Sequence, residues 1–284
     1  MSRKEGRRIK SGAPMDAVAP FIMPNRIGAA NSFSASVNVE KCEKLLRQKR
    51  LEGMKGLGMI HLFMAAYIRV ASQYPGINRF IRGQRVYARK NMEICMAIKK
   101  EMALNAPETV VKLDATPTDT LYTVYENLTK LLEENKQEGD HNNMDTAARV
   151  LMAFPSVLLK FVVWFLKLLD YFGLLPRWLT KLSPFHGSLF ITNMGSLGMP
   201  PIFHHLYNFG NLPIFIAMGK KRSEYVMNKD GEAEQKRMID FTVMCDERIC
   251  DGHYYATAFK ALQKMLENPE QLLTAPENVV EDIK

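Results

Sequence analysis

A run of mostly apolar residues at positions 59–72 constrains the fold of this chain more than any other feature. The run is too long for a strand and suits a helix that is buried inside the protein. Residues 33–39 come before it and alternate between apolar and polar side chains, as a half-buried strand does. A helical pattern follows this strand at 41–52, with Leu45 and Leu46 as apolar residues. The first part of the chain therefore alternates between strand and helix.

The middle of the chain adds further strands and a helix. Two short runs at 84–88 and 92–98 are separated by Arg-Lys-Asn, and this spacing predicts a β-hairpin. Residues 109–113 predict another strand. Residues 118–135 carry apolar side chains on one face and charged side chains on the other, which predicts an amphipathic helix.

Length and composition favour one large domain that carries an insertion. The chain has 284 residues, 47% of them hydrophobic, so it can bury a large core. The first residues are rich in Lys and Arg and lack the apolar stretch of a signal peptide, so we expect a flexible basic tail at 1–19 and a domain at 20–284. The four cysteines show neither a zinc spacing nor a disulfide framework, which favours reduced thiols and a cytoplasmic location. No combination of His, Cys and acidic residues has metal-ligand spacing, and we expect no metal.

The net charge of +8 favours an anionic partner, such as a phosphate-bearing cofactor, an acidic membrane surface or nucleic acid. No nucleic-acid-binding motif accompanies this charge, and the basic residues are spread along the chain, so we expect no nucleic-acid partner. The closely spaced glycines at 53–58 do not follow a strand. We interpret them as a flexible turn and not as a phosphate-binding loop.

Residues 246–252, Asp-Glu-Arg-Ile-Cys-Asp-Gly, form the most informative motif. The motif resembles the His-x-x-x-Asp-Gly motif of the chloramphenicol acetyltransferase-like superfamily. It is most similar to the catalytic domain of the dihydrolipoyl acyltransferase component of 2-oxoacid dehydrogenase complexes. The family has histidine at the first motif position, where this chain has Glu247. Gly187–Gly195 is similar to a strand and turn of the family, and the hairpin at 224–245 follows in the family's order, so the resemblance spans roughly residues 20 to 270.

The resemblance implies a mixed α/β (α+β) two-layer sandwich, here with a hydrophobic helical insertion, and acyl transfer from a thioester. In the family the histidine is a general base, and a hydroxyl group stabilises the tetrahedral oxyanion. Thr192 occupies the position of that hydroxyl, and Glu247 that of the base. Asp251 corresponds to a structural aspartate that pairs with an arginine, for which Arg26 is the candidate by its order in the chain.

The same resemblance implies coenzyme A as cofactor, with acyl-coenzyme A as substrate, in a channel between the subunits of a homotrimer. We expect Lys220, Lys221 and Arg222 to meet its phosphates, with a solvated turn as the alternative. The sequence shows neither a lipoyl domain nor a peripheral-subunit-binding region before residue 20. We interpret this as an argument against an ordinary core subunit of a dehydrogenase complex.

Glu247 leaves the activity open. A glutamate has an ordinary pKa near 4.3, about 4 units below that of a thiol, so an exposed glutamate is a poor base for a thiol. Burial in an apolar pocket would close much of this gap. In a second interpretation the site is a relic in which Glu247 forms a salt bridge. His253, His204 and His205 are the alternative bases.

The block at 138–185 is longer than the corresponding connection of the family, and its second part is largely apolar. Charged residues interrupt it, so it lacks the roughly 18 uninterrupted apolar residues of a membrane span. We expect it to pack against the core or another subunit, to cover an acyl group, or to lie in a membrane interface through residues 150–182, with Trp164 and Trp178 near the headgroups.

The sequence thus predicts a coenzyme A-dependent acyltransferase-like protein that transfers an acyl group from a thioester to an unknown acceptor. The alternative is a catalytically inactive homologue, a trimer that binds an acyl ligand or another protein.

Overall fold

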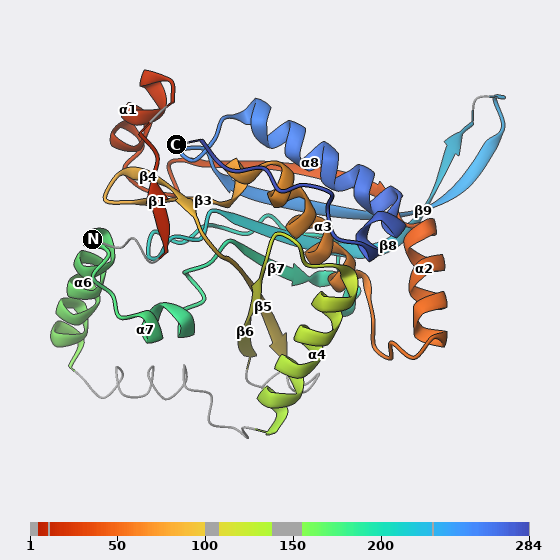
Figure 1. Ribbon diagram of the computed structural model, residues 1–284, viewed down its shortest axis with the longest axis horizontal. Helices are drawn as coiled ribbons and strands as arrows, with labels where there is room; N and C mark the ends of the chain where they lie inside the picture. Colours follow the sequence, from red (N-terminus) through yellow and green to blue (C-terminus); the bar gives the residue numbers. More distant parts are fainter. Residues whose placement is uncertain (1–4, 11, 100–107, 138–154, 229, 284) are drawn as a thin grey trace.

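The computed structural model describes residues 5–10, 12–99, 108–137, 155–228 and 230–283, and Figure 1 shows their arrangement. The strands are β1 (Gly6–Arg8), β2 (Ala30–Asn38), β3 (Arg79–Arg82), β4 (Arg85–Arg89), β5 (Met92–Lys99), β6 (Glu108–Ala115), β7 (Leu189–Asn193), β8 (Ile214–Met227) and β9 (Ala233–Asp246). The α-helices are α1 (Pro14–Ile22), α2 (Glu40–Leu51), α3 (Met59–Gln73), α4 (Leu121–Gln137), α6 (Ser156–Phe172), α7 (Arg177–Leu182) and α8 (Gly252–Glu267). Short 3₁₀ helices are η1 (Pro75–Asn78), η2 (Met194–Leu197) and η3 (Pro269–Leu273).

A six-stranded mixed sheet forms the centre of the described structure, in the order β2-β9-β8-β7-β5-β6. Strand β7 is parallel to both of its neighbours, β5 and β8, and the remaining pairs are antiparallel. Strands β8 and β9 form a long hairpin whose tip extends beyond the rest of the molecule (Figure 1). The predicted mixed α/β sandwich is confirmed.

Helices cover one face of this sheet and enclose the main core. Helix α3 is buried along nearly its whole length, as the apolar run at 59–72 predicts. Its Phe63 packs edge-on against Phe241 of β9, with ring centroids 5.5 Å apart. Helix α8 adds Phe259, which lies against Phe33 of β2. The predictions for β2, α2, α3, β6 and α4 are also confirmed to within a few residues.

A second sheet, with the strand order β1-β4-β3, corrects the hairpin predicted at 84–98. Strand β4 pairs with β3 and not with β5, and Arg82 faces Arg85 across the turn. The turn residues Gly83 and Gln84 both have positive φ, 52° and 54°, which suits a tight two-residue hairpin turn. Stacking of Phe80 on Tyr87 then holds the two strands together.

The N-terminal segment contains more regular structure than the sequence predicts, whereas the described part of the insertion is helical, as the sequence predicts. Residues expected to form a flexible tail contribute β1 and the start of α1, and Glu5 forms an ion pair with Arg82 of β3. The described part of the insertion forms α6 and α7, while its residues 138–154 lie outside the described residues. Of the helices in the described residues, none is long and apolar enough to cross a membrane.

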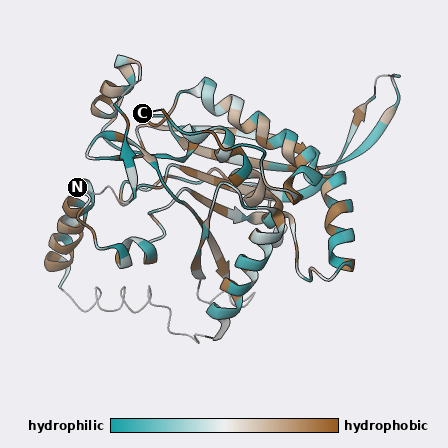
Figure 2. Cartoon of the chain, in the orientation of Figure 1, coloured by the Kyte–Doolittle hydropathy of each residue, from teal (hydrophilic) through white to brown (hydrophobic). Residues whose placement is uncertain are grey.

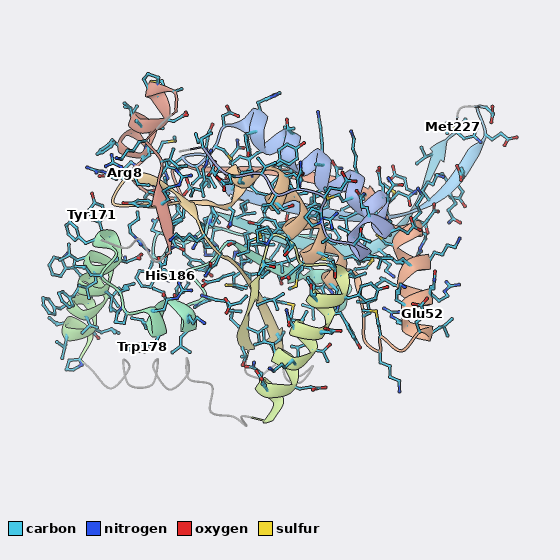
Figure 3. All side chains as sticks on the ribbon, in the orientation of Figure 1. Arg8, Glu52, Tyr171, Trp178, His186 and Met227 are labelled. Atoms are coloured by element: carbon cyan, nitrogen blue, oxygen red, sulfur yellow. The ribbon has the colours of Figure 1, made fainter. Side chains whose placement is uncertain are left out.

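Helix α6 lies at one end of the molecule and is apolar over most of its surface (Figure 2). None of its residues is buried. Tyr171 of α6 and Trp178 of α7 lie at the end of the molecule opposite Met227, which belongs to the β8–β9 hairpin (Figure 3). Helix α6 therefore forms a projecting apolar element and belongs to neither hydrophobic cluster.

Candidate active site

The motif at 246–252 connects the end of β9 to the start of α8, and its first residue is deeply buried. The Asp246 side chain is 1% exposed. Its two oxygens accept hydrogen bonds from Arg248, at 2.8 Å from Nε and 2.7 Å from Nη2. The Arg26 Nε lies 3.6 Å from the same carboxylate, close enough for an ion pair. Burial lowers the pKa of Arg26 to about 10, and the charge of Asp246 opposes this lowering.

Asp251 has a different structural role from the one that the resemblance implies. Its carboxylate accepts a hydrogen bond from the backbone N–H of Tyr254 at 2.7 Å and so caps the N-terminus of α8. Arg26 pairs with Asp246 and not with Asp251, which corrects the expected ion pair. Arg26 therefore forms an ion pair with the motif, as predicted, but with the aspartate five residues earlier in the chain.

Helix α8 is fixed to the short helix η1 by its residue Tyr254. The backbone N–H of Gly76 donates to the Tyr254 hydroxyl at 2.9 Å. A Cβ atom at Gly76 would lie 2.7 Å from ring atoms of Tyr254, so only glycine allows this approach. These contacts position the start of α8 and the motif that precedes it.

Glu247 is exposed, although it follows the buried Asp246 directly. Its backbone N–H donates to the carbonyl of Ala29 at 2.9 Å, which fixes its main chain. Within the described part of the chain, its carboxylate forms no hydrogen bond or ion pair. The single chain thus provides neither the apolar burial that would make Glu247 a stronger base nor the salt bridge of the relic interpretation.

Thr192 lies in β7 on the sheet face that points away from the main core. Side chains alternate along a strand, and Leu189 and Ile191 belong to the main core, whereas Phe190 belongs to a second, smaller cluster. Thr192, two residues after Phe190, therefore shares its face. It is half-buried and lies opposite Ala217 of β8. This position leaves its hydroxyl available as a hydrogen-bond donor.

Thr192 and Glu247 of one chain lie at different ends of the sheet. Thr192 pairs with Ala217, and Ala217 pairs with Thr242 of β9, five residues before Glu247. At about 3.3 Å per residue and about 4.8 Å between strands, the two residues are roughly 19 Å apart. One chain therefore does not bring the predicted oxyanion donor and the predicted base together.

The three candidate histidines lie in two places. The ring of His204 stacks on Phe215, with centroids 3.9 Å apart, on the sheet face that also carries Thr192. His205 is exposed and stacks against His204. His253 is exposed in the first turn of α8, near Glu247 in the chain. His204 and His205 thus lie on the Thr192 side of the predicted site, and His253 lies on the Glu247 side.

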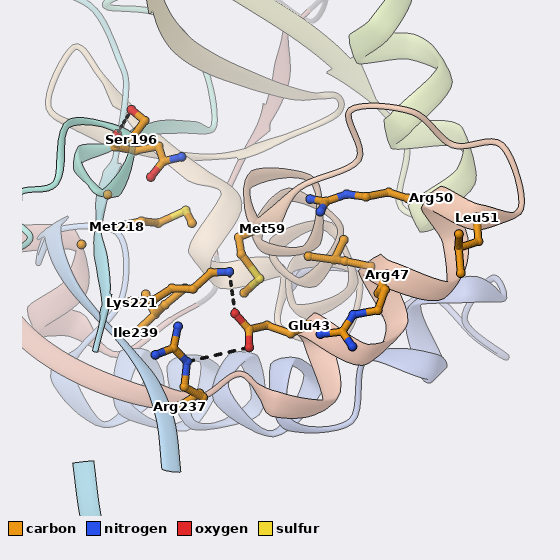
Figure 4. Close-up of a pocket in the computed structure, with 14 residues that line it drawn as sticks. Glu43, Arg47, Arg50, Leu51, Met59, Ser196, Met218, Lys221, Arg237 and Ile239 are labelled. Atoms are coloured by element: carbon orange, nitrogen blue, oxygen red, sulfur yellow. Dashed lines mark hydrogen bonds and ion pairs between the residues drawn. The ribbon is translucent and has the colours of Figure 1, made fainter. Parts of the chain in front are cut away.

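A cavity of about 730 Å³ opens beside the turn that follows Thr192 (Figure 4). The turn contributes Asn193 and Ser196, and β8 contributes Met218 and Lys221. Arg47 and Arg50 of α2 and Arg237 of β9 also line it. Four cations and one carboxylate, that of Glu43, give the wall a net charge of about +3. Such a wall favours an anionic ligand.

Glu43 organises part of this cavity. Its carboxylate lies 2.5 Å from Nζ of Lys221 and 3.9 Å from Nε of Arg237 (Figure 4). Arg50 donates from Nε to the carbonyl of Leu57 at 2.7 Å. Arg47 forms no ion pair with any of the described residues. The cavity therefore offers guanidinium groups that are not neutralised by acidic neighbours.

Of the three predicted phosphate-binding residues, only Lys221 lines this cavity. Arg222 points elsewhere and forms ion pairs with Asp240 at 2.7 Å and Glu224 at 2.5 Å. Lys220 is exposed, and its backbone N–H donates to the carbonyl of Met199.

The sequence did not predict the other three basic residues of the cavity, Arg47, Arg50 and Arg237. Arg47 and Arg50 are three residues apart on one face of α2, which is a detectable spacing. Arg237 pairs with Ser223 across the hairpin, and only the strand register shows this.

The structure also contains no metal-binding cluster of three or more His, Cys, Asp or Glu residues among the residues it describes.

Comparison with known proteins identifies related sequences and folds. Residues 180–274 match the family model of the 2-oxoacid dehydrogenases acyltransferase (catalytic domain). A search of curated proteins finds no significant match.

Similar solved structures include a dihydrolipoamide acetyltransferase from Azotobacter vinelandii, with a TM-score of 0.60 and 13% identity over 91% of this chain and 88% of that chain. A truncated catalytic core of the 2-oxoacid dehydrogenase multienzyme complex from Thermoplasma acidophilum has a TM-score of 0.54 and 15% identity, over 92% and 98%. A chloramphenicol acetyltransferase has a TM-score of 0.50 and 12% identity, over 90% and 96%.

The description of the Azotobacter structure assigns a serine, a histidine and an asparagine to the catalytic mechanism of that enzyme. At these identities the structural matches establish the fold, and the family model adds the relationship of the C-terminal part. The chain therefore has the chloramphenicol acetyltransferase-like fold, and its residues 180–274 match the catalytic-domain family of the 2-oxoacid dehydrogenase acyltransferases.

Proposed function

We propose that this protein is a coenzyme A-dependent acyltransferase, which transfers an acyl group from a thioester to an acceptor that is still to be identified. The observation that carries the proposal is the cationic cavity beside the turn after Thr192. Coenzyme A carries several phosphate charges, and guanidinium groups bind phosphate oxygens in pairs of hydrogen bonds. We propose Arg47 for this contact, because it has no acidic partner among the described residues, together with Lys221 and Arg237, which share the single carboxylate of Glu43.

In the proposed reaction, the Thr192 hydroxyl donates a hydrogen bond to the oxyanion that forms when the acceptor attacks the acyl carbonyl. Glu247 takes the position of the base. In the Azotobacter enzyme, the mechanistic histidine and asparagine are numbered four residues apart, as Glu247 and Asp251 are here. Asp251, which caps α8, then acts as a scaffold for Glu247.

The proposed active site needs two copies of the chain, because Thr192 and Glu247 of one copy are roughly 19 Å apart by strand geometry. We therefore propose a homotrimer in which Thr192 of one subunit faces Glu247 of the next. Leu197, Met199 and Phe203 support an interface on the Thr192 side, since they are 48 to 59% exposed. The Thermoplasma match is itself described as a core of a multienzyme complex. With its four free cysteines, the protein is proposed to work in the reducing cytoplasm.

The exposed carboxylate of Glu247 favours a second candidate function. An ordinary glutamate falls about 4 pKa units short of a thiol as a base, which corresponds to a deficit of roughly 5 to 6 kcal/mol. If assembly does not bury Glu247 and no histidine replaces it as the base, the protein would bind an acyl thioester without turnover. The second candidate is therefore a catalytically inactive trimer that binds an acyl ligand or a protein.

Turnover and binding are tested separately. Purified protein is incubated with acetyl-coenzyme A and longer acyl-coenzyme A species, together with a dithiol, an alcohol or an amine as acceptor. Release of coenzyme A is followed by chromatography. Activity that falls roughly 10²- to 10³-fold in Thr192→Val, but not in Thr192→Ser, would support the oxyanion role. Glu247→Ala, His204→Ala and His253→Ala then identify the base.

Binding of coenzyme A is measured by calorimetry in the same protein. We expect Arg47→Gln and Arg237→Gln each to weaken binding about tenfold, since each removes a charge-assisted hydrogen bond. Arg85→Gln is the matched control, because Arg85 is exposed on β4, outside the cavity. Binding without turnover, together with activity gained in Glu247→His, would favour the inactive homologue. Neither binding nor turnover would refute both functions.

A further inference from the structure

The outer face of α6 is apolar and exposed. We define this face by Val157, Phe161, Trp164, Phe165, Leu168 and Phe172, whose side chains are 38 to 82% exposed. At about 100° per residue, all six lie within an arc of roughly 100° on the helix. Large exposed apolar patches on a protein surface generally mark an interaction site. The size of the outer face therefore indicates an interaction site.

The opposite face of α6 attaches the helix to the rest of the protein. Leu159, Val162, Leu166 and Leu169 are half-buried on this side. Asp170, on the same side, accepts a hydrogen bond from the backbone N–H of Gly210 at 3.0 Å and contacts Nε2 of His186 at 3.1 Å. These contacts fix the direction of the outer face, which points away from the sheet. Asp170 thus anchors the C-terminal end of α6 to the rest of the protein.

Positive charge borders the outer face. At about 100° per residue, Lys160 lies roughly 40° and Lys167 roughly 60° beyond its Trp164 edge. Within the ranges that the structure describes, neither lysine forms an ion pair. The only acidic residue of α6 is Asp170, and its carboxylate is turned inward. Beyond α6, Trp178 of α7 adds an aromatic side chain that is 64% exposed.

We propose that the outer face of α6, together with Trp178, binds the surface of a membrane that contains anionic lipids. An interfacial helix combines an apolar face rich in Phe, Leu and Trp with basic residues beside it, and α6 has this combination. The apolar side chains enter the boundary between headgroups and acyl chains. Lys160 and Lys167 reach the phosphate groups, and tryptophan rings prefer this depth. Because α6 has 17 residues and three charged side chains, it lies in the interface and does not span it.

Charge also favours lipid over a second copy of the chain. A two-fold contact between two outer faces would bring the four lysines of two copies to the same boundary. No carboxylate of α6 is available there to pair with them, since Asp170 already binds His186. An anionic bilayer supplies the missing negative charge over its whole surface.

The two tryptophans of the chain, Trp164 and Trp178, provide a native probe of this surface. The full-length protein is titrated with phosphatidylcholine vesicles and with vesicles of phosphatidylcholine and phosphatidylserine. We expect a blue shift of tryptophan emission and co-sedimentation with the anionic vesicles. Brominated lipids should quench the emission, which shows that the rings enter the bilayer. Binding should weaken about tenfold or more when salt rises from 0.05 to 0.5 M, because screening shortens the reach of the lysine charges.

Variants separate the apolar from the charged contribution. The pair Phe161→Ser and Phe165→Ser should lower vesicle affinity at least tenfold, and the pair Lys160→Gln and Lys167→Gln should remove the salt dependence. The matched control combines Val226→Ser with Val279→Ser, two exposed apolar residues outside α6. Equal circular dichroism melts would show that the variants remain folded.

The proposal fails if anionic vesicles leave the emission unchanged, or if the phenylalanine pair binds as tightly as the unchanged protein. It also fails if the Phe161→Ser and Phe165→Ser pair changes the sedimentation coefficient of the lipid-free protein but leaves vesicle binding unchanged. The outer face would then be a contact between copies of the chain. The outcome does not depend on acyl transfer.

Discussion

Replacing Asp246 by Asn should cost far more stability than the same replacement at Asp251, five residues later. The Asp246 carboxylate is 1% exposed and lies between two guanidinium groups, those of Arg26 and Arg248, which are 6% and 3% exposed. An amide keeps the shape of the carboxylate but removes the charge that both arginines face. Two cations would then be buried without a counter-ion.

The expected loss for Asp246→Asn is about 3 to 5 kcal/mol in the free energy of unfolding, the range found when one partner of a buried ion pair is removed. Asp251 is exposed and caps α8, and asparagine caps helices as well as aspartate does. Asp251→Asn should therefore change stability by less than about 0.5 kcal/mol, whereas Asp251→Ala should cost about 1 kcal/mol.

Urea unfolding, followed by circular dichroism at one fixed protein concentration, measures both variants. With a slope of about 3 kcal/mol per molar, Asp246→Asn should lower the midpoint by roughly 1 to 2 M. The second variant, Asp251→Asn, should leave the midpoint almost unchanged. If Asp251→Asn proves as costly as Asp246→Asn, the assignment of the buried ion pair to Asp246 is wrong.

Three further predictions concern protons and buried polar groups. Burial lowers the pKa of His61 from 6.5 to about 4, so the free energy of unfolding should fall by about 3 kcal/mol as the pH drops from above 6.5 to 4. The variant His61→Gln still accepts a hydrogen bond from the N–H of Gly58, and in urea unfolding it should show a weaker dependence of stability on pH. Asp170→Ala should cost about 1 to 3 kcal/mol in the same measurement, because it leaves polar groups of His186 and Gly210 without an acceptor; a loss below 0.5 kcal/mol would contradict this. Iodoacetamide at pH 8 should alkylate the folded protein much more slowly than the unfolded protein, because burial raises the thiol pKa of every cysteine. Mass spectrometry measures the alkylation, and fast alkylation of any cysteine in the folded protein would contradict this. The pKa rises to about 12 in Cys42 and Cys250, to about 11 in Cys95, and well above the ordinary value in Cys245.

Local patterns in the sequence predict the elements of the fold better than they predict their partners. The apolar run at 59–72 predicts α3 because periodicity and length depend only on neighbouring residues. The hairpin at 84–98 is wrongly predicted because strands β4 and β5 are close in the chain but pair in different sheets. Gly83, inside the actual turn between β3 and β4, is the signal that could have corrected it.

The candidate site shows the same limit. The resemblance identifies the segment that contains Thr192 and the one that contains Glu247, but not that they lie at different ends of the sheet. The cationic cavity joins α2, β8, β9 and the turn after β7, and no local pattern connects these four segments. Arg26 is correctly identified as a partner for the motif, but sequence order cannot choose between Asp246 and Asp251.

The contrast between Asp246 and Glu247 explains how this fold can persist while its chemistry changes. Asp246 is buried and binds two arginines, so its replacement should weaken the connection between β9, α8 and the N-terminal segment. Its neighbour Glu247 is exposed, and within the described structure its side chain touches no charged partner. Substitutions at exposed positions without specific contacts usually change stability by less than about 0.5 kcal/mol. A change from histidine to glutamate at this position would therefore leave folding almost unaffected, while it removes a base of near-neutral pKa. In the proposed function, stability and turnover thus depend on adjacent but independent residues, and Glu247→His should restore the family's base without repacking the core.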